Sequence, residues 1–193
     1  MIIKRFLAFL IDFIFIMTFS SLVCEIRFLN PNYDKAYSAG EKYYDLLEDV
    51  MNNNVDFDNN MITDVIYDVE VNTISNSIIQ IVSFVLYYVG FQKWNNGQTI
   101  GKKIMKIKVV GKNTDKVSIA SYLLRTIILF GLYGEIISIV MIKLCNKDIY
   151  LNLMLILNNL VIIMYYVNAF MVILRKDHLG LHDKIAKTRV ISI

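Results

Sequence analysis

Residues 6–26 have the sequence FLAFLIDFIFIMTFSSLVCEI, and this apolar stretch decides the fold. As a helix rising about 1.5 Å per residue, its 21 residues can cross the ~30 Å hydrocarbon core of a bilayer. A cleaved signal peptide needs an uninterrupted apolar centre and a small-residue cleavage site, but Asp12 interrupts the stretch and no such site follows. We therefore predict a retained first transmembrane helix with a carboxylate inside the membrane.

Three more apolar stretches follow the first. Residues 71–92 and 149–174 contain no charged residue, and residues 119–142 contain only Arg125 and Glu135. The whole chain of 193 residues is 56% hydrophobic and has one proline, a composition typical of membrane proteins. We predict an all-α membrane protein that forms a single domain with four transmembrane helices and a small cytoplasmic β element.

The charges of the connecting segments indicate how the chain is oriented. Residues 27–70 hold ten acidic residues, whereas residues 93–118 and the tail, residues 175–193, are basic. Because Lys and Arg concentrate on the cytoplasmic side, we predict cytoplasmic termini, a cytoplasmic loop 93–118 and an acidic outer loop 27–70. Apolar side chains recur at helical spacing from Tyr33 to Met51, so part of the outer loop is predicted to be an amphipathic helix. The abundant Asn and Ile suggest an AT-rich genome, which favours a bacterial inner membrane.

The β element is predicted from two short stretches of the basic segments. Residues 104–110 alternate between apolar and charged side chains, and residues 188–193 also have a strand pattern. A short helix over residues 181–186 precedes the second stretch, and Lys116 and Val117 could form a short return strand. Strands this short are not stable alone, so we predict that all three join one cytoplasmic sheet.

Counting from each membrane face places the polar residues of the apolar helices in two layers. Asp12, Arg125 and Asn168 form an inner layer, each seven residues from the cytoplasmic end of its helix. An outer layer lies about seven to nine residues from the outer ends of the helices, and its members are Thr18, Gln80, Glu135, Asn158 and Asn159. Charged and amide side chains rarely face lipid, so both layers are predicted to converge inside the bundle. In particular, we expect an ion pair between Asp12 and Arg125.

Four motifs together resemble the RDD family of membrane proteins. They are Arg5 with Asp12, residues 97–110 (GQTIGKKIMKIKVV), residues 123–125 (LLR) and residues 181–190 (LHDKIAKTRV). The Arg and two Asp for which this family is named correspond to Arg5, Asp12 and Asp183. The resemblance implies a multi-spanning bacterial membrane protein of mostly undefined activity, and some members are thought to exchange cations for protons.

Two further points concern individual residues. Lys106 and Lys187 stand where the family often has glycine. Arg5, which the ion pair between Asp12 and Arg125 leaves free, is expected to hold Asp183 of the tail.

The glycine motif of residues 97–110 resembles a phosphate-binding loop but differs from it in spacing. A P-loop has four residues between its glycines and Ser or Thr after the lysine, whereas here three residues separate Gly97 from Gly101 and Lys103 follows Lys102. We therefore predict a tight turn that presents lysines to lipid headgroups. The residues of this turn motif are Gly97, Gln98, Thr99, Gly101 and Lys102.

Three further patterns have simpler interpretations. Asp56, Asp58 and Asn60 match the start of a calcium loop, but Met61 replaces the required glycine and Tyr67 the required Glu, which favours a solvated acidic loop. His178, His182 and Asp183 lack further nearby ligands for a metal site, so we expect interfacial histidines. Cys24 and Cys145 could meet across the outer face, but two unpaired thiols are favoured.

The sequence leaves two function classes open. We find no nucleophile–base–acid set and expect a non-enzymatic protein without cofactor, metal or nucleic-acid partner, embedded in a lipid bilayer. The favoured class is an accessory or scaffold protein that binds a membrane partner. The alternative is a small cation/proton exchanger that uses Asp12 and Glu135, and its pathway would add Gln80, Asn158, Asn159 and Asn168.

Overall fold

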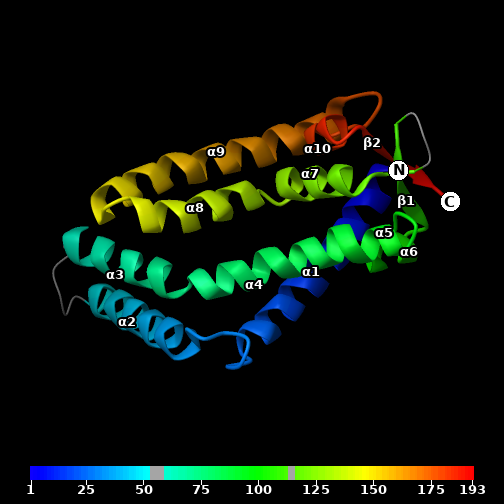
Figure 1. Cartoon of the computed structure of the whole chain (residues 1–193). Helices are drawn as coiled ribbons and strands as arrows, with labels where there is room; N and C mark the ends of the chain where they lie inside the picture. The colour runs from blue at the N-terminus through cyan, green and yellow to red at the C-terminus, as the bar shows by residue number, and fades with distance from the viewer. Residues whose placement is uncertain (53–58, 113–115) are drawn as a thin grey trace.

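The computed structural model describes residues 1–52, 59–112 and 116–193. Long helices form a bundle with a small sheet at one end, and both termini lie beside that sheet (Figure 1). Helices α1 (Ile2–Cys24) and α9 (Lys147–Leu174) are long and apolar enough to cross a membrane. So is the continuous helix of α4 (Ile74–Val85), the π-helical η1 (Leu86–Phe91) and α5 (Gln92–Trp94). The predicted all-α membrane fold with a small β element is confirmed.

The third predicted helix is broken in the middle. Helix α7 (Ile119–Leu129) meets α8 (Leu132–Leu144) at an angle of 78°, and the pair is the fourth span if it crosses the membrane together. Gly131 lies at the break with a left-handed φ of 61°, and a Cβ atom there would lie 2.6 Å from the Tyr165 hydroxyl. Tyr165 donates a hydrogen bond of 2.6 Å to the Phe130 carbonyl, so a side chain satisfies a carbonyl at the break.

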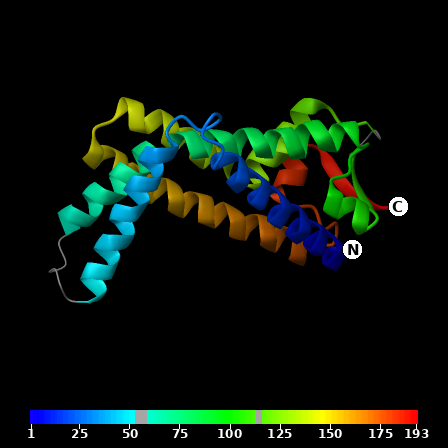
Figure 2. The same cartoon turned by 90° about the horizontal axis from the view of Figure 1, so that it is seen from below.

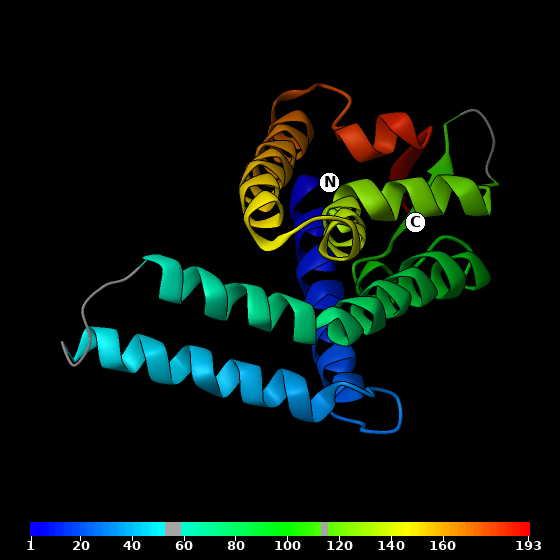
Figure 3. The ribbon, with the colours of Figure 1, turned by 60° about the vertical axis from the view of Figure 1, so that its left-hand side comes forward.

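The predicted acidic outer loop is instead a hairpin of two helices. Helices α2 (Tyr33–Met51) and α3 (Asn59–Asn72) pack against each other and project to one side of the bundle (Figures 2 and 3). Helix α2 confirms the predicted helix, but its buried residues are Ala39 and Leu46, whereas Tyr37 and Tyr44 of the predicted apolar face are exposed. The calcium-loop positions Asp56 and Asp58 lie outside the described residues.

The sheet has two antiparallel strands, β1 (Ile107–Gly111) and β2 (Thr188–Ser192). The predicted strand 104–110 begins later than expected because a short helix, α6 (Ile100–Ile104), occupies its start. The predicted return strand at Lys116 and Val117 is wrong, because these described residues have no strand structure. The Val117 side chain instead packs against the apolar core beside the sheet.

The sheet end consists of two copies of one unit. Each copy is a single-turn helix, a lysine with left-handed φ and a five-residue strand: α6, Lys106 and β1 in one, and α10 (Leu181–Ile185), Lys187 and β2 in the other. The Lys112 N–H donates to the Lys187 carbonyl at 2.8 Å, and the Ile193 N–H donates to the Lys106 carbonyl at 2.9 Å. These equivalent bonds at the two ends of the ladder give the element an approximate two-fold symmetry.

An apolar core joins the sheet to the long helices. Its buried members come from α1, η1, both strands and α7, and they are Ala8, Val89, Ile107, Val109, Tyr122 and Val190. A second core lies within the bundle around Ile16, Phe84 and Leu132. The sheet is therefore packed on the spans and holds the polar residues of α6 and α10 against them.

Candidate functional site

The buried Asp12 carboxylate joins α1 to the glycine motif. The hydroxyl of Tyr87 donates a hydrogen bond of 2.6 Å to it, the Gly101 N–H donates one of 2.8 Å, and the Thr99 hydroxyl donates a third. These donors are neutral, and they come from η1 and the start of α6. The predicted ion pair between Asp12 and Arg125 is therefore wrong.

Small residues allow α6 to approach α1 this closely. A Cβ atom at Gly101 would lie 2.3 Å from the Ala8 carbonyl and 3.0 Å from the Asp12 carboxylate. Gly97 has a φ of 88°, and a Cβ atom there would lie 2.3 Å from the Val109 carbonyl. The Gln98 amide donates to the Ile107 carbonyl at 3.0 Å. The predicted tight turn at residues 97–102 is therefore a turn at Gly97 followed by α6, and it forms a backbone donor site for Asp12.

The fully buried Asp183 carboxylate joins the tail to two spans. Arg5 of α1 donates to one carboxylate oxygen at 2.5 Å, and Arg125 of α7 forms an ion pair with the other. Arg5 also donates to the His178 carbonyl at 2.5 Å, and Arg125 donates to the Thr188 hydroxyl at 3.1 Å. The predicted contact between Arg5 and Asp183 is confirmed, and Arg125 shares the same carboxylate.

Two basic side chains near these carboxylates, His182 and Lys102, have lowered pKa values. His182 lies with its Nδ1 atom 2.6 Å from the Asn168 amide oxygen, and burial, together with Arg125, lowers its pKa well below the ordinary value. Burial also lowers the pKa of Lys102 to about 7, although Asp12 partly opposes the shift. The Lys102 amine donates to the Gln92 side chain at 3.2 Å. Burial at the sheet end therefore disfavours the charged forms of both basic groups.

Sequence reasoning missed two side chains of this network. The Tyr87 hydroxyl donates to Asp12 and accepts from the Ile100 N–H at 3.1 Å. Gln92 is buried and donates to the Gly97 carbonyl at 3.3 Å, so it fixes the turn before α6. The sequence signal for this role was the position of the polar Gln92 amide at the end of a charge-free apolar stretch.

The predicted outer polar layer is only partly assembled. Gln80, Glu135 and Asn158 line a cavity of about 410 Å³ beside the break between α7 and α8, together with Glu70 of α3. Asn159 does not line this cavity, and its amide donates to the Leu155 carbonyl of its own helix at 2.7 Å. Thr18 is also exposed outside it. The prediction that all five residues converge is therefore wrong for Thr18 and Asn159.

The histidines and cysteines take separate positions. His178 lies with Nδ1 3.1 Å from the Val172 carbonyl, whereas His182 contacts Asn168 and Asp183. Cys24 and Cys145 are free thiols, as the sequence favoured. In the described ranges, no group of three or more His, Cys, Asp or Glu side chains is arranged to hold a metal ion.

Comparison with known proteins gives one match. The model of the RDD family matches residues 1–187. No curated protein and no solved structure matches the chain. The match includes Arg5, Asp12 and Asp183, the residues whose contacts attach the small α6–β1 and α10–β2 units to the spans.

Proposed function

The chain belongs to the RDD family of membrane proteins, and from this we propose that it binds a cation within the membrane and exchanges it for protons. The cavity beside the α7–α8 break is the observation that supports this function. Its polar lining includes Gln80, Glu135 and Asn158, whose oxygen atoms suit hard cations such as Na⁺ or K⁺.

The broken span adds to the argument for an ion site. Discontinuous helices near the middle of a membrane are typical of transporter binding sites, because backbone groups freed at the break can face a cavity. Phe130 and Gly131 at the break line this cavity, as does Glu135 in the first turn of α8. The Ser77 hydroxyl donates to Glu135 at 3.1 Å and so orients the carboxylate.

Glu70 is the group best suited to couple cation binding to protons. It lies on α3 and lines the same cavity. Burial raises the pKa of Glu70, the nearby Glu135 charge raises it further, and a hydrogen bond from Tyr150 opposes the shift. A cation in the cavity would favour the charged form of Glu70, so binding would release a proton.

The proposal differs from the sequence-based alternative in the residues of its pathway. Asp12 was expected to serve the pathway with Glu135, but three donors occupy its carboxylate and it does not line the cavity. The pathway we propose therefore uses Glu135 and Glu70 and excludes Asp12 and Asn159. Positive charge at the sheet end favours a cytoplasmic location for both termini in a bacterial inner membrane. We propose no enzymatic activity.

Cation flux into proteoliposomes under an imposed pH gradient tests this function. We expect flux in the parent protein, its loss in Glu135→Gln and a reduced rate in Asn158→Ala. Asn159→Ala is the matched control, since the neighbouring amide lies outside the cavity, and it should keep the parent rate. Absence of flux in the parent, or equal losses in the two Asn variants, would refute the proposal.

The α2–α3 hairpin favours a second candidate, the accessory or scaffold function. Tyr37, Tyr44 and Met51 are exposed along α2, and the hairpin projects from the bundle (Figure 3). Aromatic side chains exposed on a projecting helix suit a membrane partner. A photo-crosslinking residue at Tyr44 should then capture one specific protein in intact cells, while proteoliposomes show no flux. Flux without any captured protein would instead favour exchange.

A further inference from the structure

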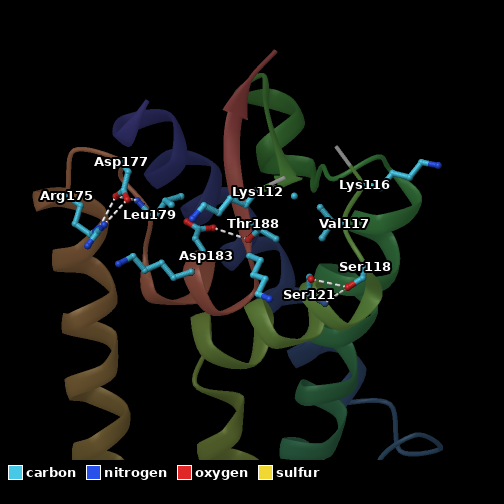
Figure 4. A pocket seen from close by; sticks show the side chains of 13 residues that line it. Lys112, Lys116, Val117, Ser118, Ser121, Arg175, Asp177, Leu179, Asp183 and Thr188 are labelled. Carbon is cyan, nitrogen blue, oxygen red and sulfur yellow. Dashed lines mark hydrogen bonds and ion pairs between the residues drawn. The ribbon is translucent and has the colours of Figure 1, made fainter. Parts of the chain in front are cut away.

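A second pocket, of about 790 Å³, lies at the sheet end of the bundle (Figure 4). Ser118 and Ser121 of the α7 start form one side, and Arg175 and Asp177 after α9 lie opposite. Asp183 lies between them. This pocket shares no lining residue with the cavity of the proposed cation site and does not depend on it.

The lining of this basic pocket has an excess of positive charge. Both carboxylates among its described lining residues are occupied, because Asp177 pairs with Arg175 and Asp183 pairs with Arg5 and Arg125. Three lining lysines, Lys112, Lys184 and Lys187, are exposed and make no ion pair within the described part of the chain. An anion that enters the pocket would therefore meet ammonium groups that form no ion pair with the described residues.

Neutral groups of the pocket also suit an anion. Ser118 caps α7 by accepting from the Ser121 N–H at 3.0 Å, and the two hydroxyls lie 3.0 Å apart. The first turn of α7, which has 11 residues, adds the positive end of its helix dipole. Hydroxyls, lysines and a helix start are the donors that commonly bind phosphate oxygens.

The position of the pocket matches the headgroup region of a membrane. It is bounded by Ser118, directly before α7, and by Arg175, directly after α9, so it lies where spans end. Basic pockets between helices at this level bind the headgroups of anionic lipids. We propose that the basic pocket binds an anionic phosphoryl group, supplied by a phospholipid headgroup or by a soluble phosphate compound.

Titration of the full chain in neutral detergent tests the proposal and separates the two sources. Short-chain phosphatidylglycerol, short-chain phosphatidylcholine and inorganic phosphate are added separately, and the rise in the thermal midpoint gives the apparent affinity. A rise with phosphatidylglycerol alone indicates a lipid headgroup, and a rise with inorganic phosphate indicates a soluble ligand. No rise with either, or equal rises with the two lipids, overturns the proposal.

Paired charge variants locate the binding. Lys112→Gln with Lys184→Gln should weaken binding about tenfold or more. Lys93→Gln with Lys103→Gln removes the same charge from exposed positions outside the pocket and should change the affinity less than about twofold. Ser121→Asp, a single change, serves if the first pair fails to fold, and it should also weaken binding. Equal losses in the pocket and control pairs, or full affinity in Ser121→Asp, would contradict the assignment.

Discussion

The two carboxylate networks predict that Arg125 is energetically coupled to Asp183 but not to Asp12. Asp183→Ala leaves the guanidinium groups of Arg5 and Arg125 buried without their carboxylate, which should cost about 3–5 kcal/mol of unfolding free energy. Arg125→Ala leaves Asp183 with Arg5 and should cost about 1.5–3 kcal/mol, the range for a charged hydrogen bond. Because both changes remove the same contact, the double variant should be less destabilised than their sum by about 1–3 kcal/mol.

A second mutant cycle supplies the control. Among the described residues, Asp12 and Arg125 share no hydrogen-bond partner, since neutral donors from η1 and α6 bind Asp12, whereas Arg125 binds Asp183 and Thr188. Asp12→Ala and Arg125→Ala should therefore add within about 0.5 kcal/mol. Reversible unfolding in mixed micelles, followed by circular dichroism, measures both cycles. Strong coupling of Asp12 to Arg125 with additivity of Asp183 and Arg125 would refute the assignment of partners.

Three further changes have defined outcomes. Gly101→Ala should lower the thermal midpoint in detergent because its methyl group collides with α1, whereas Gly40→Ala, where a Cβ atom meets nothing within 4 Å, should raise it slightly. Lys106→Gly and Lys187→Gly should each stabilise by about 1 kcal/mol in denaturant titration, because glycine adopts their left-handed φ without strain. Lys102 has a folded pKa of about 7 against 10.5 unfolded, so its unfavourable contribution should diminish as pH rises between these values, and Lys102→Met should flatten that part of the stability–pH profile.

The spans could be predicted because length and hydrophobicity alone determine whether a helix can cross a membrane. Residues 6–26 and 149–174 correspond to α1 and α9 with small shifts at their ends. The break in residues 119–142 could not be predicted, because Gly131 within an apolar run is equally compatible with a continuous helix. The break depends on the Tyr165 hydroxyl, which comes from a span 35 residues away and satisfies the Phe130 carbonyl.

The partner of Asp12 shows what depth alone leaves undetermined. Asp12 and Arg125 are both buried, as expected for residues at one level, but depth does not determine which face of each helix points inward. Asp12 was expected to need a cation, whereas hydroxyl and backbone donors can stabilise a buried carboxylate equally well. The backbone donor at Gly101 belongs to α6, a short helix that was not predicted because residues 104–110 have a strand pattern.

Lys106 and Lys187 are exceptions to the rule that glycine occupies positions with left-handed φ. Lys106 and Lys187 have left-handed φ values of 55° and 53°, which L-residues adopt only at a cost. Each lies between a single-turn helix and a strand, and the bonds to their carbonyls close the two ends of the sheet. The surrounding packing therefore imposes a conformation that the sequence alone would assign to glycine.

The three residues for which the family is named lie apart from the cavity of the proposed cation site. Arg5, Asp12 and Asp183 are occupied in attaching α6 and α10 to the spans, and none of them lines the cavity beside the α7–α8 break. Residues such as Glu135 and Asn158, which do line it, lie outside the three for which the family is named. In this chain those three residues therefore hold the sheet end against the spans, and under the proposed function its ion specificity would come from residues around the break.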